Sequence, residues 1–219
     1  MFGKKKQVTR NALGAALVFA FSATPVAFAA DEKGFYGIVG LGQSEADINA
    51  PAGVSVDNKD TSYFLGAGYR FNDYVSVEGG YLDLGEFSAS GSGSVSGTYS
   101  GTPYTATGTF SAKSDAKGWF LGPKFTLPLS KKMDLYGKVG YYFWDSDTTF
   151  SASGTFTIGG VTYAGGVSAK ASTSGDDPYY GVGLAYRFTD RIGIQADFTR
   201  YSIQDTDVDM LALGLTFKF

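Results

Sequence analysis

The chain has 219 residues, a formal net charge of −3, and neither cysteine nor histidine. These absences exclude disulfide bonds and the ordinary zinc and copper sites, which need Cys or His ligands. The acidic balance gives no electrostatic basis for binding nucleic acid, whereas 31 Gly, 15 Tyr and 18 Phe are unusual for a soluble domain.

The first 30 residues have the three-part pattern of a secretory signal peptide. Four basic residues precede an apolar run from Ala12 to Ala23, and a small-residue exit follows at Ala27–Ala30. A membrane anchor is the alternative, but this run of about 12 residues is shorter than the roughly 20 that a spanning helix needs. We therefore expect a signal peptide at 1–30 and one exported domain at 31–219, with a formal charge of 14 − 21 = −7.

After residue 31, runs of about ten residues alternate large apolar side chains with small or polar ones, the period of a half-buried strand. "YRFND" at Tyr69–Asp73 recurs as "YRFTD" at Tyr186–Asp190, and each copy joins two runs through a polar turn, which is a hairpin signal. The eight predicted strands are Phe35–Gln43, Tyr63–Phe71, a run from Val75, Trp119–Leu127, Asp134–Trp144, Tyr180–Phe188, a run from Ile192, and Met210–Phe219.

The connections between these strands alternate strictly between short and long. The short ones lie at 72–73, 128–132 and 189–191, whereas the long ones cover about 44–60, 85–117 and 146–178, with an intermediate one near 202–207. All tight turns therefore fall at one end, as in outer-membrane barrels. The two longest connections, which share "FSASG", are expected to be hairpins projecting beyond a membrane, although two further membrane hairpins would give a twelve-stranded barrel.

The contents of the two faces favour a membrane barrel over a soluble eight-stranded one such as a lipocalin. In Asp134–Trp144 one face is apolar and the other carries Lys138, and polar faces elsewhere are rich in Gly, which suits a narrow lumen. Aromatic residues gather near both ends of the apolar faces, as in a membrane girdle. The girdle candidates are Tyr69, Phe71, Tyr186 and Phe188 beside the short turns, and Trp119, Tyr141 and Phe143 toward the long connections.

Pro123 lies inside a strand that has no unpaired edge in a closed barrel. Because proline has no backbone N–H to donate, we expect a bulge or a local loss of pairing there.

The stretches "GAGYRFNDYVSVEGGYLDLGE", "LGPKFTLPLSKKMDLYGKVGYYFWDSD" and "GLAYRFTDRIGIQADFTRYS", with the closing "LALGLTFKF", resemble the OmpA-like and OmpX-like barrels of Gram-negative outer membranes. The resemblance implies an all-β fold, an eight-stranded antiparallel up-and-down transmembrane β-barrel with two long extracellular β-hairpin loops. It also implies that Phe217 and Phe219 form the C-terminal signal read by the barrel-assembly machinery. No peptidoglycan-binding domain is expected, since the sequence ends with the barrel.

The same resemblance implies a charge network inside the barrel. Glu78 stands where the family has an acidic residue on the third strand, and Lys124 and Lys138 stand where it has basic residues on the fourth and fifth. The usually basic position on the seventh strand reads Gln195, and Asp197 follows on the same face. We expect Glu78 to pair with Lys124 or Lys138, because unpaired charges in a filled lumen are costly.

The sequence thus predicts a structural or surface-interaction protein of the cell outer membrane, with a barrel plugged by salt bridges. The alternatives are a narrow porin-like channel for small solutes, an adhesin acting through its loops, and a membrane-embedded enzyme. Catalysis is not expected, because the chain has no His to act as general base. No cofactor or metal is expected, and the expected partners are outer-membrane lipid, lipopolysaccharide, the assembly machinery and a host or surface ligand, with the barrel monomeric.

Overall fold

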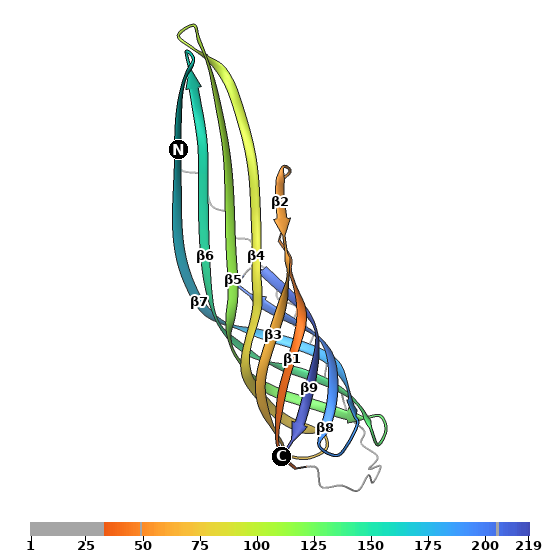
Figure 1. Cartoon of the computed structure of the whole chain (residues 1–219). Helices are drawn as coiled ribbons and strands as arrows, with labels where there is room; N and C mark the ends of the chain where they lie inside the picture. Colours follow the sequence, from red (N-terminus) through yellow and green to blue (C-terminus); the bar gives the residue numbers. More distant parts are fainter. Residues whose placement is uncertain (1–32, 49, 205) are drawn as a thin grey trace, which may run out of the picture.

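The computed structural model describes residues 33–48, 50–204 and 206–219, which form one sheet of nine antiparallel strands (Figure 1). The predicted signal peptide lies outside the described residues. No helix in the described part of the chain is long and apolar enough to cross a membrane. The strands are β1 (Gly34–Ala46), β2 (Val54–Asp57), β3 (Lys59–Arg70), β4 (Val75–Tyr99), β5 (Thr102–Pro128), β6 (Met133–Ile158), β7 (Val161–Arg187), β8 (Ile192–Ile203) and β9 (Thr206–Lys218).

The pairings close the sheet on itself. Each strand from β3 to β8 pairs with the next strand along the chain, and β1 pairs with β3. The last strand, β9, returns to pair with Tyr36–Ala46 of β1. Closure removes the free edge that an apolar strand such as β9 would otherwise expose. The predicted all-β antiparallel fold is confirmed.

The sheet has nine strands where eight were predicted, and β2 is the additional one. β2 lies in the long connection at about 44–60, where no strand was predicted, and it pairs only with Ser88–Gly91 of β4. Its four residues, Val54–Asp57, are too short for periodicity to distinguish them from a loop.

Four strands are far longer than a membrane requires. β4 to β7 have 25 to 27 residues each, whereas a membrane-crossing strand needs about 9 to 11. The two long connections are therefore continuations of these strands, which turn at Ser100–Gly101 and Gly159–Gly160 and add no new strands to the ring. Figure 1 shows the four strands extending well beyond the rest of the sheet.

The two extensions pair with each other along β5 and β6, from Tyr104↔Ile158 to Ser114↔Thr148. They form one four-stranded sheet, which we call the arm, and not two separate hairpins. The arm comprises Phe87–Tyr99, Thr102–Ser114, Thr148–Ile158 and Val161–Ala171.

Below the arm, alternation divides the side chains between the outside and the interior. On β9, Leu211 and Leu213 are 65% and 61% exposed, while the intervening Ala212 is 2% exposed. On β6, Tyr141 and Phe143 point outward, whereas Tyr142 is fully buried. The outward face is thus apolar yet uncovered, the arrangement that lipid contact requires.

A shift in register occurs where β4 leaves this region. The β4–β5 pairing passes from Asp83↔Lys117 to Glu86↔Asp115, with Gly85 at φ +88° between them, a backbone conformation that favours glycine. Phe87 consequently points inward and is 8% exposed. The inner face of the arm therefore carries the odd-numbered residues of β4.

At Pro123 the pairing with β6 is interrupted. The β5–β6 ladder passes from Leu121↔Tyr141 to Lys124↔Lys138 without a change of register, so Gly122 and Pro123 have no partner there. The expected local loss of pairing is found, and there is no bulge at this site. Pro123 still lies opposite Val77 of β4.

The three tight turns share one hydrogen-bonding design. Asn72, Ser130 and Thr189 each use a side-chain oxygen to accept backbone N–H groups of the residues that open the next strand; the Asn72 carboxamide accepts from Tyr74 at 2.8 Å and from Val75 at 2.9 Å. Such side chains replace the backbone partners that a tight turn lacks. All three turns lie at the end of the sheet opposite the arm (Figure 1).

Candidate functional site: the charged interior

Two ion pairs lie inside the closed sheet. Glu78 of β4 pairs with Lys124 of β5 at 2.8 Å, and Asp197 of β8 pairs with Lys138 of β6 at 2.6 Å. All four face inward because they fall on the inner alternation of their strands. The structure thus brings together charged residues from positions more than 100 residues apart.

The Glu78–Lys124 pair is enclosed by hydrogen-bond partners. The Tyr36 hydroxyl donates to Glu78 Oε1 at 2.7 Å, and Lys124 Nζ also donates to Gln195 Oε1 at 3.1 Å. The side chains of Glu78 and Lys124 are 4% and 5% exposed. A buried pair of this kind is stable only when its remaining lone pairs and protons are satisfied in this way.

The Lys138–Asp197 pair is held similarly. Asp197 accepts from the Tyr136 hydroxyl at 3.0 Å and from the Thr199 hydroxyl at 2.8 Å, and its side chain is fully buried. Lys138, whose side chain is 14% exposed, is the third donor to Asp197. Asp197 therefore has three donors from three different residues.

Tyr136 joins the two pairs into one network. Its hydroxyl bonds Asp197, and the face of its ring lies 4.0 Å from Lys124 Nζ, within range of a cation–π interaction. Because residue 195 is an uncharged Gln, two cations meet two carboxylates and the network is neutral.

Little space remains around this network. A cavity of about 10 Å³ touches Glu78, Lys138 and Gln195, and a single water needs roughly 10 to 15 Å³. On the arm side, Tyr142, Tyr179 and Tyr201 form a buried aromatic layer, with ring centroids 5.3 and 5.5 Å apart. The side chains therefore fill most of the interior at this level.

Sequence reasoning named Glu78, Lys124, Lys138, Gln195 and Asp197, and the structure places all five in this network. It missed the donors Tyr36, Tyr136 and Thr199. For Tyr136 the available signal was its place between Asp134 and Lys138 on the polar face of its strand. Which residues meet across the interior depends on strand register, and sequence periodicity does not give that register.

The predicted aromatic girdle residues all lie on the outward face. Near the tight turns, Tyr69 contacts Phe35 and Phe71 edge to face, and Tyr186 contacts Phe188 in the same way. Toward the arm, Trp119 packs edge to face on Tyr81 and is 63% exposed, near the exposed Tyr141 and Phe143.

Phe217 and Phe219 also point outward, 41% and 87% exposed. The Phe219 N–H donates to the Phe35 carbonyl at 3.1 Å, which fastens this end of the chain to β1. Their predicted role in assembly stays a prediction.

Among the described residues, no group of three or more Asp or Glu side chains is placed to hold a metal ion.

Comparison with known proteins identifies the family. The family model described as outer membrane protein beta-barrel domain matches residues 13–219. Outer membrane protein A of Shigella flexneri is 26% identical over 160 residues, covering 69% of this chain and 38% of that protein. The same protein of Escherichia coli O157:H7 is 30% identical over 155 residues, covering 69% of this chain and 37% of that protein. The chain thus spans less than two fifths of the length of these relatives.

Among solved structures, Ail of Yersinia pestis aligns with a TM-score of 0.45 at 19% identity, covering 86% of this chain and 99% of that one. The family match extends over every described strand and agrees with the closed antiparallel sheet and its apolar exterior. The chain belongs to the outer-membrane β-barrel proteins, is OmpA-like among them, and resides in the outer membrane.

Proposed function

We propose that the chain is a plugged, eight-stranded transmembrane barrel that presents the arm at the cell surface as an interaction surface. In this proposal residues 1–30 direct export and are removed, the tight turns face the periplasm, and the arm projects outside the cell. The strict alternation of short and long connections supports that orientation, since outer-membrane barrels have short periplasmic turns and long extracellular loops.

The placement in the membrane is supported by where charge begins on the outward face. Directly beyond the paired row Tyr81, Trp119 and Phe143, the outward positions become charged at Asp83, Lys117 and Asp145. Charged residues on the lipid face are costly at mid-membrane and tolerated near the interface. We infer that this rim lies at the level of the lipopolysaccharide head groups.

The observation that carries the proposed surface role is the chemistry of the arm. Directly paired residues of neighbouring strands share a face, and the register therefore sorts the arm residues into two sets. The outward set is hydroxyl-rich, with rows Ser96–Thr105–Thr157–Thr162, Ser92–Thr109–Ser153–Gly166 and Ser90–Ser111–Ser151–Ser168. The inward set is apolar, with rows Val95–Ala106–Phe156–Tyr163, Gly93–Gly108–Gly154–Gly165, Gly91–Phe110–Ala152–Val167 and Ala89–Ala112–Phe150–Ala169.

The chemistry of each face is therefore the reverse of that in the barrel below. The outward face changes from apolar to hydroxyl-rich, and cross-strand hydroxyl pairs such as Thr107–Thr155 at 2.7 Å run along it. The inward face changes from a polar interior to an apolar surface, on which Val95, Tyr163 and Val167 are 58 to 62% exposed. A hydrated exterior is expected for a sheet in water, whereas an uncovered apolar face needs a partner.

The area of that face is large enough to bind one. Twelve steps of about 3.4 Å along four strands spaced about 4.8 Å apart give roughly 600 Å². Contiguous apolar patches above a few hundred Å² mark interaction sites in soluble proteins. We assign the inner face of the arm the role of contacting an apolar surface outside the cell.

The test compares cells that display the full chain or its variants. The inner-face variant is Val95→Ser, Phe156→Ser and Tyr163→Ser; the matched outer-face control is Thr107→Ser, Thr155→Ser and Thr162→Ser. We expect the inner-face variant to lose most of the adhesion to polystyrene while adhesion to glass is unchanged, and the control to adhere as the wild type does. Equal adhesion by all three would refute the surface role, provided heat-modifiable gel migration shows that each barrel is folded.

The narrow channel is the second candidate, and the small interior cavity argues against it. The account predicts no stepwise conductance when the purified wild type is added to a planar bilayer. Regular conductance steps in the wild type that change in Glu78→Ala would instead favour the channel. The matched family and the relatives named above are described as outer-membrane proteins, and none of them is described as an enzyme.

A further inference from the structure

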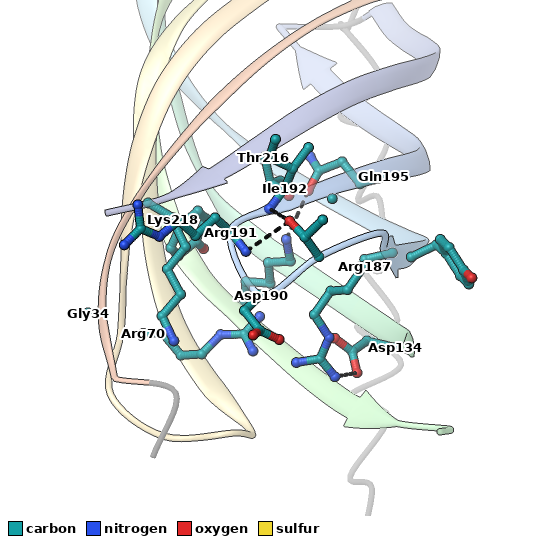
Figure 2. A pocket seen from close by; sticks show the side chains of 16 residues that line it. Gly34, Arg70, Asp134, Arg187, Asp190, Arg191, Ile192, Gln195, Thr216 and Lys218 are labelled. Carbon is teal, nitrogen blue, oxygen red and sulfur yellow. Dashed lines mark hydrogen bonds and ion pairs between the residues drawn. The ribbon is translucent and has the colours of Figure 1, made fainter. Parts of the chain in front are cut away.

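A cavity opens at the end of the barrel that holds the tight turns (Figure 2). It has a volume of about 70 Å³, compared with the roughly 10 to 15 Å³ that one water requires. The space thus suits several waters or one tetrahedral oxyanion. Arg70, Arg187, Lys218 and the turn 189–192 surround it, and Lys124 and Gln195 of the interior network lie at its inner end.

The lining is strongly basic. Five cationic side chains line the cavity, together with two carboxylates, Asp134 and Asp190. The cations are Arg70, Lys124, Arg187, Arg191 and Lys218.

Two ion pairs involve cations of this lining. Lys124 binds Glu78 at 2.8 Å, and Arg187 Nη2 binds Asp134 at 3.4 Å, a pair visible in Figure 2. Counting Glu78 with the two lining carboxylates leaves a surplus of 5 − 3 = 2 positive charges.

This surplus contrasts with the rest of the chain. Beyond residue 30 the sequence has 14 basic and 21 acidic residues, yet positive charge is concentrated at this mouth. Three of the four arginines in the described residues, Arg70, Arg187 and Arg191, line the cavity. Solubility alone does not require these arginines to lie around one cavity.

The turn that closes the cavity is fixed by its own hydrogen bonds. The Thr189 hydroxyl oxygen accepts the backbone N–H of Arg191 at 3.3 Å and that of Ile192 at 3.0 Å, shown as dashed lines in Figure 2. These N–H groups are therefore occupied, and a ligand would be bound by side chains. Arginine suits such a role because its planar donors match the oxygens of a phosphate group in pairs.

We propose that this mouth is a binding site for a phosphate group. Its position on the periplasmic side rests on the proposed topology; its capacity to bind an anion does not. The group could be carried by a soluble phosphate or by a phospholipid head group, since the cavity lies beside the outward aromatic residues Tyr186 and Phe188 that border the membrane. The same basic side chains would bind either one.

The first experiment titrates inorganic phosphate into the full chain, folded in zwitterionic micelles at constant ionic strength, and follows the heat of binding. The site variant is Arg191→Gln with Lys218→Gln. The matched control is Lys131→Gln with Lys132→Gln, which removes two charges from a neighbouring turn outside the cavity. We expect the site variant to bind at least about tenfold more weakly, because two charge-assisted contacts are lost, and the control to bind as the wild type does.

The second experiment distinguishes the source of the phosphate group. The wild type, the site variant and the control are folded into phosphatidylcholine vesicles with or without 30% phosphatidylglycerol, and their unfolding temperatures are compared. If phosphatidylglycerol raises the unfolding temperature of the wild type and the control but not that of the site variant, the site binds the lipid head group. Binding of inorganic phosphate without such a gain assigns it to a soluble phosphate.

Two outcomes overturn the proposal. In one, the wild type neither binds inorganic phosphate nor gains stability from the anionic lipid. In the other, phosphate binding is weakened equally in the site variant and the control, which would mean that general surface charge attracts the anion. Heat-modifiable gel migration verifies in each case that the protein tested is folded, and none of these outcomes depends on what the arm contacts.

Discussion

Replacing Lys124 by Met tests whether the interior ion pairs hold the barrel together. The substitution removes the 2.8 Å bond to Glu78, the 3.1 Å bond to Gln195 and the contact with the Tyr136 ring. Glu78 keeps only the Tyr36 hydroxyl among the partners described above, at a position 4% exposed. Breaking a buried ion pair from one side costs about 3 to 5 kcal/mol, because the remaining charge stays buried.

The double variant Lys124→Met with Glu78→Gln removes that remaining charge and isolates the pair. We expect it to recover most of the loss, since replacing both partners of a buried pair is often nearly neutral. The assay is urea unfolding in lipid vesicles, followed by the loss of the fast-migrating folded band, and the coupling comes from the double-mutant cycle.

The control is Lys113→Met with Glu86→Gln, a pair of the same 2.8 Å length where β4 enters the arm, with side chains 57% and 51% exposed. Exposed pairs contribute little, and its midpoint should not move. A Lys124→Met barrel as stable as the wild type, or a double variant less stable than the single one, would refute this reasoning.

Three further predictions concern the exterior, a turn and the rim. Leu213→Lys places a charge on the lipid side, where Leu213 is 61% exposed, and should lower the free energy of unfolding in vesicles by about 2 to 4 kcal/mol; a smaller effect in Leu213→Ala serves as the control. Asn72→Ala removes the acceptor of two turn N–H groups and should cost about 1 to 2 kcal/mol in the same assay, whereas Asn72→Asp, which keeps the acceptor, should cost little. Burial raises the pKa of Asp115, but the Asp147 N–H at 2.9 Å and Lys117 at 3.0 Å outweigh it and lower that pKa below its ordinary value. The stabilisation from Asp115 is therefore complete above the ordinary carboxyl pKa and is lost as the pH falls through the folded value; an NMR titration of Asp115 with a midpoint at or above the ordinary value would contradict this.

The antiparallel sheet and the facing of its side chains could be predicted from the sequence because their signal is local. Alternation with period two assigns Lys138 inward and Val139 outward without knowledge of any other strand. The alternation of short and long connections is also a local pattern, and it predicted that the tight turns lie together at one end of the strands. The break in pairing at Pro123 was also predictable, because the missing backbone N–H acts at that position alone.

The rest depends on register between strands distant in sequence. Tyr136 meets Asp197 across the interior, 61 residues away, and no local pattern gives that distance. The arm was expected as two hairpins because nothing in the sequence shows that β5 continues to pair with β6 beyond the membrane. The shift at Gly85 also decides which side of β4 faces inward, so the apolar face of the arm was visible only in the structure.

The two tryptophans allow the most direct test of the central claim, that apolar side chains face lipid and the interior is sealed. Trp119 is 63% exposed on the outward face, and Trp144 is 3% exposed inside, with its indole N–H donating to Asp177 at 2.9 Å. The measurement is fluorescence quenching by brominated phospholipids in two variants, each keeping one tryptophan: Trp144→Phe and Trp119→Phe. The account predicts strong quenching of Trp119 and little of Trp144; equal quenching of both, or quenching of Trp144 alone, would show that the faces are assigned wrongly.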